Sequence, residues 1–156
     1  MKKYTLPRIL LLLAFALRLV PIASAMDEHE HEGGKAKIPD TVAAIWSEVK
    51  EHEEELGKTI AEKKLDKVHE IAFEIRDYVN ALPDKSKDLP ADKLAKVKAS
   101  AKFVASLADR LDKSGDANDQ AGTEANFKRL QTILKDIETQ YPASMLKGDD
   151  MKGMKM

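Results

Sequence analysis

The sequence predicts an all-α protein, an antiparallel up-down-up-down four-helix bundle with a flexible segment at each end. Composition is the first observation: only 5% of the 156 residues are aromatic, with 7 Gly and 6 Pro, which argues against a β-barrel or a β-sandwich. Second, apolar residues recur at spacings of three and four in four separate stretches between residues 39 and 142. Third, short turn sequences separate these stretches, and about 100 residues with four apolar stripes can bury one core.

Residues 1–25 have the features of a secretory signal peptide, in which basic residues precede a nine-residue apolar run, Ile9 to Leu17. Ala23 and Ala25 fit the small-x-small pattern, so we expect cleavage after Ala25. A nine-residue helix rises about 14 Å, roughly half of a bilayer core, which disfavours the alternative of an uncleaved membrane anchor. Because the segment has no Arg-Arg pair, we expect export by the Sec route to a bacterial periplasm.

The mature chain is acidic and lacks cysteine. Removal of residues 1–25, which hold four basic and no acidic residues, leaves 22 basic and 27 acidic residues and a net charge of −5. This charge suits an exported protein with no membrane span and carries no nucleic-acid signature. The lack of Cys excludes disulfides, thiol catalysis and cysteine-ligated zinc.

The first two helices are expected over residues 41–63 and 65–82. Pro39 and Asp40 precede the first helix, with Asp40 as its N-cap. Pro83 follows the second helix directly and is expected to end it. The very short connection makes the two helices antiparallel neighbours. Their apolar stripes contain Val42, Ile45, Trp46, Val49, Leu56 and Ile60, and then Leu65, Val68, Ala72, Ile75, Val79 and Leu82.

The third and fourth helices are expected over about 90–114 and 118–141. Pro90 suits a first helical turn, where its missing N–H needs no partner. Gly115 is expected to end the third helix in a left-handed conformation, and Pro142 closes the fourth. Their stripes contain Leu94, Val97, Ala101, Val104, Ala108 and Leu111, and then Phe127, Leu130, Leu134, Ile137 and Tyr141. Residues 39–142 therefore form the bundle.

Residues 26–38 form a polar leader that we expect to be flexible. Within it, residues 27–32 place two imidazoles, His29 and His31, among four carboxylates. Imidazole and carboxylate are suitable ligands for Cu(II) and Zn(II), so the leader is a candidate site for an oxidised copper ion or for zinc. The alternative is a solvated acidic segment that aids solubility.

Residues 143–156 leave the helical pattern and are expected to form a second flexible segment. They hold four of the five methionines of the mature chain, and Met151, Met154 and Met156 have the spacing M-x-x-M-x-M. Thioether sulfur is soft, favours Cu(I), and persists where a thiol would be oxidised. Because core-filling methionines would show the opposite distribution, this tail is a candidate Cu(I) site. An incidental polar tail is the alternative.

The two histidines of the bundle, His52 and His69, are expected to be hydrogen-bonded residues at the edge of the core. In an antiparallel hairpin they are offset by about eight residues, or roughly 12 Å, so they cannot bind one ion or one haem together. Neither follows a Glu by three positions, as a di-metal carboxylate site would require. We expect no haem, and with no nucleophile–base arrangement and no phosphate-binding glycine loop we expect no enzyme activity.

The combination of these features resembles small exported four-helix-bundle proteins associated with copper and other heavy-metal handling. MDEHEHE at 26–32 and MKGMKM at 151–156 carry this resemblance. The run KVHEIAFEIRDYVNALP at 67–83 also looks like a segment of an uncharacterised bacterial periplasmic family. The resemblance implies a copper buffer, a copper chaperone or a resistance accessory that passes metal to an efflux protein or another periplasmic partner.

Two other interpretations stay open. In one, the protein is an exported interaction or stress-response module, whose bundle surface binds another protein and whose terminal segments have no metal role. In the other, the protein is a carrier of a small molecule or a haem, which is bound between the helices.

Overall fold

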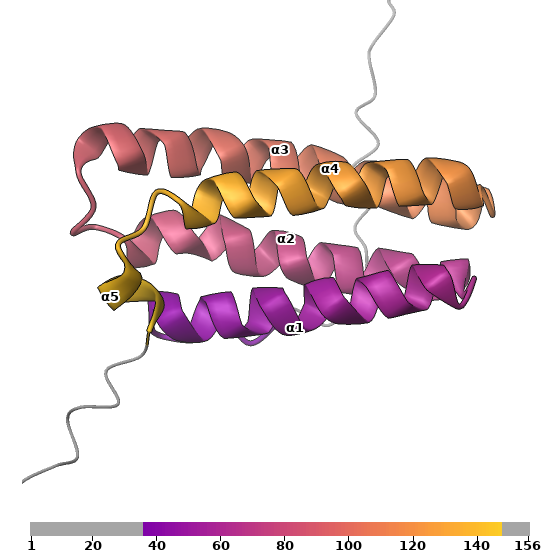
Figure 1. Ribbon diagram of the computed structural model, residues 1–156, viewed down its shortest axis with the longest axis horizontal. Helices are drawn as coiled ribbons and strands as arrows, with labels where there is room; N and C mark the ends of the chain where they lie inside the picture. Colours follow the sequence, from indigo (N-terminus) through magenta and orange to yellow (C-terminus); the bar gives the residue numbers. More distant parts are fainter. Residues whose placement is uncertain (1–35, 148–156) are drawn as a thin grey trace, which may run out of the picture. The chain divides into compact units, whose positions relative to one another are not determined.

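The computed structural model describes residues 36–147, and this part of the chain is helical and contains no strand. Four long helices run back and forth side by side (Figure 1). The predicted all-α bundle is therefore confirmed. In chain order its elements are α1 (Val42–Ala61), the 3-10 turn η1 (Leu65–Lys67), α2 (Val68–Lys85), α3 (Ala91–Asp116), α4 (Gln120–Glu138) and the short helix α5 (Ala143–Leu146).

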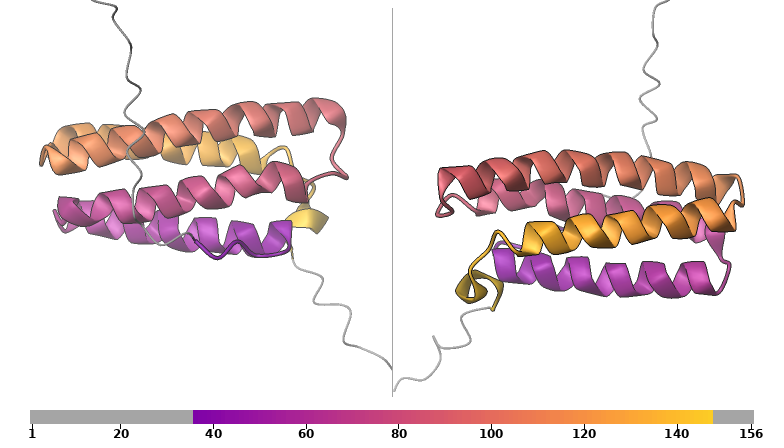
Figure 2. Two further views of the ribbon diagram at one scale, coloured as in Figure 1. Left: turned by 180° about the vertical axis from the view of Figure 1, so that it is seen from behind. Right: turned by 45° about the horizontal axis from the view of Figure 1, so that its top comes forward.

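The core lies between the four long helices, and each helix turns its apolar stripe toward it. Figure 2 shows α2 beside both α1 and α3, with α4 beside α3. The predicted stripe residues are buried, except that Leu94 and Phe127 are only half-buried. Complete burial of one large aliphatic side chain contributes about 1.5–3 kcal/mol. The largest fully buried side chains are those of Ile45, Leu56, Ile75, Leu82, Leu111, Leu130 and Ile137.

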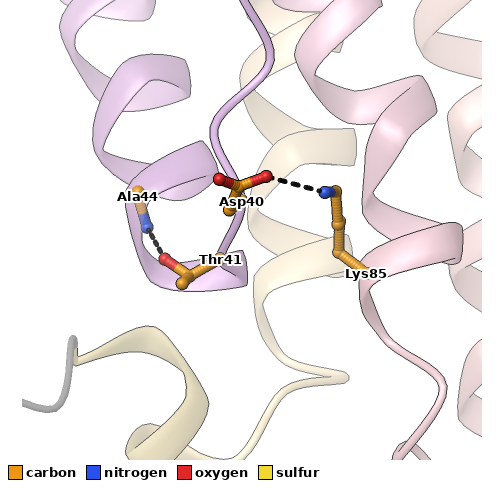
Figure 3. Close-up of polar contacts among 4 residues, drawn as sticks. All are labelled: Asp40, Thr41, Ala44 and Lys85. Atoms are coloured by element: carbon orange, nitrogen blue, oxygen red, sulfur yellow. Dashed lines mark hydrogen bonds and ion pairs between the residues drawn. The ribbon is translucent and has the colours of Figure 1, made fainter.

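The N-cap of α1 is Thr41 and not Asp40, the residue that the sequence predicts. The Thr41 hydroxyl oxygen accepts a hydrogen bond from the Ala44 backbone N–H at 3.2 Å (Figure 3). Asp40 lies one residue earlier, where its carboxylate turns outward and pairs with the Lys85 ammonium at 3.4 Å. Threonine and aspartate both cap helices well, so residue type does not decide between Thr41 and Asp40. The position at which the chain enters the bundle decides which of the two caps α1.

Pro83 does not end the second helix, because α2 continues to Lys85. A proline in the last turn removes only the hydrogen bond that its N–H would have given to the Val79 carbonyl. Residues on either side of Pro83 hold this last turn in helical form. Leu82 is fully buried, and the Ser86 hydroxyl donates to the Leu82 carbonyl oxygen at 2.6 Å. Tertiary contacts therefore outweigh the helix-breaking tendency of proline at this position.

Gly115 does not form the left-handed cap that the sequence predicts. It lies inside α3, which ends at Asp116, and its φ is not positive. In the turn after α3 the left-handed residue is Asn118, with a φ of 51°, a conformation that asparagine tolerates better than most residues. Glycine is needed at position 115 for another reason, namely space: a Cβ there would lie 2.8 Å from the Leu65 carbonyl oxygen.

The first residues after Pro142 also differ from the expectation of a flexible segment. Ala143–Leu146 form the short helix α5, which packs against α1. Met145 and Leu146 are half-buried against the core. The gain from burying these two apolar side chains explains why helical packing against the bundle continues beyond residue 142.

Candidate functional site

The side chains that the sequence singles out as metal ligands lie outside the described residues. These are His29 and His31 in the leader, and Met151, Met154 and Met156 in the C-terminal segment. Residues 1–25, which the sequence predicts to be a signal peptide, also lie outside them.

The buried core contains no methionine. Its apolar residues are Ile, Leu, Val, Ala, Phe, Tyr and Trp. Met145 is the one methionine within residues 36–147, and it is half-buried in α5. Of the four methionines in the predicted tail, Met145 therefore packs against the bundle, whereas the other three follow it in the sequence.

His52 lies on α1 between two hydrogen-bond acceptors. Its Nδ1 is 2.8 Å from the Glu48 carbonyl oxygen, and its Nε2 is 2.9 Å from Glu74 Oε2, which belongs to α2. A carbonyl oxygen and a carboxylate oxygen can only accept hydrogen bonds. A protonated imidazole can donate to both oxygens, whereas a neutral imidazole can donate to one of them. This confirms the prediction that His52 is a hydrogen-bonded residue at the edge of the core.

Tyr78 completes this polar cluster between α1 and α2. The edge of its ring meets His52, with the ring centroids 5.2 Å apart. Burial raises the pKa of the Tyr78 phenol, and the Glu48 and Glu74 carboxylates raise it further. Among residues 36–147, no three His, Asp or Glu side chains lie close enough together to hold a metal ion. The cluster therefore links two helices, and we assign it no metal.

α1 and α4 meet along a seam with polar side chains. Lys50 Nζ lies 2.6 Å from Glu138 Oε1, and the Gln131 amide donates to Glu53 Oε1 at 3.1 Å. Next to these pairs is an open hollow of about 400 Å³, and Trp46 forms part of its lining. The indole N–H of Trp46 is buried and has no hydrogen-bond partner within the described part of the chain. The charges around this hollow offset one another, so the seam selects no class of ligand by its charge.

A second hollow, of about 410 Å³, lies between α3 and α4. Phe103 stands at this hollow with 61% of its surface exposed, and it is the exposed large hydrophobic residue of the described chain. Phe103 is not among the candidate residues that the sequence patterns indicate, although its place outside the apolar stripe of the third helix was a usable signal. The hollow is lined by Phe103, Ser106, Leu107 and Arg110 of α3 and by Arg129, Thr132 and Ile133 of α4.

Comparison of the chain with family models, with curated proteins and with solved structures finds no match. Within residues 36–147, no helix has the length and apolar character needed to cross a bilayer.

Proposed function

We propose that this protein is an exported metal-binding protein, that copper is its metal, and that its two terminal segments supply the ligands. The observation that carries the proposal is the distribution of methionine. The bundle core is filled without methionine, while Met151, Met154 and Met156 lie within six residues of one another at the end of the chain. Methionine packs well in irregular cores, so its place outside this core favours a role for the sulfur atoms.

The two segments suit the two oxidation states of copper. The thioethers of Met151, Met154 and Met156 are soft ligands for Cu(I). The imidazoles of His29 and His31, with the carboxylates around them, suit Cu(II) or Zn(II). In this proposal the bundle is the carrier, and an efflux protein or another periplasmic protein receives the metal.

The Cu(I) site is tested by replacing Met151, Met154 and Met156 together with Leu in the mature chain. Competition with a Cu(I) chelator should show an affinity reduced about tenfold or more, equivalent to roughly 1.4 kcal/mol. Met145→Leu is the matched control. Because Met145 packs against the core, this change should leave Cu(I) affinity as it was. A triple variant with the affinity of the unchanged protein overturns the assignment of the tail.

The Cu(II) site is tested with the double change His29→Ala and His31→Ala. We expect weaker Cu(II) binding, while His52→Gln, a change within the bundle, should bind Cu(II) like the unchanged protein. Helical circular dichroism checks that each variant is folded. If all variants bind either ion equally and weakly, the metal proposal is wrong and the interaction-module interpretation takes its place.

A further inference from the structure

The outer face of α3 and α4 combines an exposed aromatic side chain with a hollow that has an apolar floor. Leu107 is buried and Ile133 is half-buried, so Phe103 stands above a surface that is already partly apolar. A single exposed hydrophobic residue needs no explanation, but an aromatic beside an apolar hollow is typical of an interface anchor. We call the seven lining residues of this hollow the α3/α4 groove.

The groove has an apolar end and a basic end. The Asn126 amide donates to the Arg110 carbonyl oxygen at 3.3 Å, which sets the register between α3 and α4. In this antiparallel register Phe103 lies across from Ile133. Arg110 lies seven residues further along α3, which is about 10 Å along the helix axis. Arg129 lies on the same side, one helical turn before Ile133.

The two arginines at the basic end have no partner of opposite charge in the described chain. Within residues 36–147, neither the Arg110 nor the Arg129 guanidinium forms an ion pair, and Arg129 donates only to the Asn126 side-chain oxygen at 3.4 Å. Arginine and aromatic residues are the types most enriched at the centre of protein interfaces. Two guanidinium groups beside an apolar hollow are therefore complementary to carboxylates on a partner.

Charge is unevenly divided between the two halves of the bundle. α1 and α2 together contain 4 basic and 9 acidic residues, whereas α3 and α4 contain 9 basic and 7 acidic residues. The groove thus lies on the basic half. A two-fold dimer through this face would place one basic surface against another, which like-charge repulsion disfavours.

We propose that the α3/α4 groove is a docking site for an acidic amphipathic helix of another protein. An apolar residue of the partner helix, Leu or Phe, contacts Phe103 and Ile133. Carboxylates about one and two turns further along the partner pair with Arg129 and Arg110. A helix is the form that fits, because the lining residues of α3 and of α4 each follow the i, i+3, i+4 spacing of one helical face and together form a groove between the two helices.

The test uses a stapled helical peptide of about 15 residues, with Leu at the anchor position and Glu four and seven positions later, titrated into the mature protein by fluorescence anisotropy. The control peptide has Lys in place of both Glu residues. We expect the Glu peptide to bind and the Lys peptide to bind about tenfold more weakly or not at all. Equal binding of the two peptides, or no binding of either, overturns the proposal.

Matched variants locate the site. Phe103→Ser changes an exposed side chain, so the fold should persist while peptide affinity falls about tenfold or more. The pair Arg110→Gln and Arg129→Gln should weaken binding and reduce its salt dependence. The pair Lys98→Gln and Lys128→Gln removes the same charge from exposed positions outside the groove, and peptide affinity should stay within about twofold. Binding that Phe103→Ser leaves unchanged overturns the site.

Two further results would show that the α3/α4 groove binds something other than an acidic helix. Analytical ultracentrifugation of the protein alone should show a monomer, and a dimer that Phe103→Ser dissociates would identify a second copy as the occupant. Vesicles of phosphatidylglycerol should not bind the protein, and vesicle binding that depends on Phe103 would identify a membrane surface. Either result overturns the acidic helix.

Discussion

Gly115 of α3 lies against the backbone carbonyl of Leu65, so closely that a Cβ on the glycine would stand 2.8 Å from the carbonyl oxygen. The same added Cβ would stand 3.4 Å from the Val68 Cβ. A backbone carbonyl cannot move aside as the end of a side chain can. The contact between Gly115 and Leu65 therefore sets how closely the start of α2 approaches the end of α3.

Gly115→Ala should therefore destabilise the protein by about 1–3 kcal/mol, despite the higher helix propensity of alanine. Urea unfolding measures the change. Gly57→Ala is the control, since its Cβ would meet the Phe127 ring at 3.2 Å, and the end of that half-buried ring can move aside. Gly57→Ala should leave stability unchanged or raise it by up to about 1 kcal/mol. Equal stability of the two variants would contradict the steric role of Gly115.

Thr41→Ala should cost about 1 kcal/mol, because it removes the side-chain acceptor of the α1 N-cap. Asp40→Ala should leave the unfolding midpoint unchanged, since the Asp40 side chain is 99% exposed and, within residues 36–147, its one ion pair is with Lys85 at 3.4 Å. Chemical denaturation of the two variants distinguishes the cap from its neighbour. The reverse order of stabilities would show that Asp40 is the cap.

Ser86 and Tyr141 form a buried hydrogen bond between the end of α2 and the residues after α4. The two hydroxyl oxygens are 2.9 Å apart, and the Ser86 hydroxyl already donates to the Leu82 carbonyl, so Tyr141 is the donor. Tyr141→Phe should destabilise the protein by about 1 kcal/mol. A double-mutant cycle with Ser86→Ala should give a coupling of about 0.5–1 kcal/mol, and strictly additive effects would contradict the bond.

Tyr78 and Tyr141, the two tyrosines within residues 36–147, should both ionise above their ordinary pKa of 10.0. Burial raises the pKa of both the Tyr78 and the Tyr141 phenol. A phenol with a raised folded pKa contributes stability that is complete below pH 10 and is lost as the pH rises through the folded value. Tyrosinate absorbance during alkaline titration measures this, with Tyr141→Phe isolating Tyr78. Ionisation of either tyrosine at its ordinary pKa in the folded protein would contradict this prediction.

A chain of residues 36–147 should have the same thermal unfolding temperature as a chain of residues 26–156. A shorter chain of residues 39–142 should unfold several degrees lower, because it lacks the half-buried side chains of Ala36, Ile38, Met145 and Leu146. Equal unfolding temperatures for the two truncated chains would show that α5 contributes nothing. The comparison also shows which of these two chains should be used when metal binding is measured without the terminal segments.

The sequence by itself determined the number of long helices, their order and the face that each one buries. Ile45, Ile75, Val104 and Ile137 all fall on predicted stripes and are all buried, because a helical period specifies a face without knowledge of the neighbouring helix. The terminal His and Met motifs are likewise properties of the sequence, and their function stays a prediction.

Only the tertiary structure decided the helix ends and the use of particular residues there. Thr41 rather than Asp40 caps α1, α2 passes through Pro83, and Asn118 takes the left-handed conformation expected of Gly115. Local preferences at these positions differ by about 1–3 kcal/mol, so packing against a second helix can reverse them. The α3/α4 groove also required the structure, since its shape depends on the register of two helices, which neither helix contains alone.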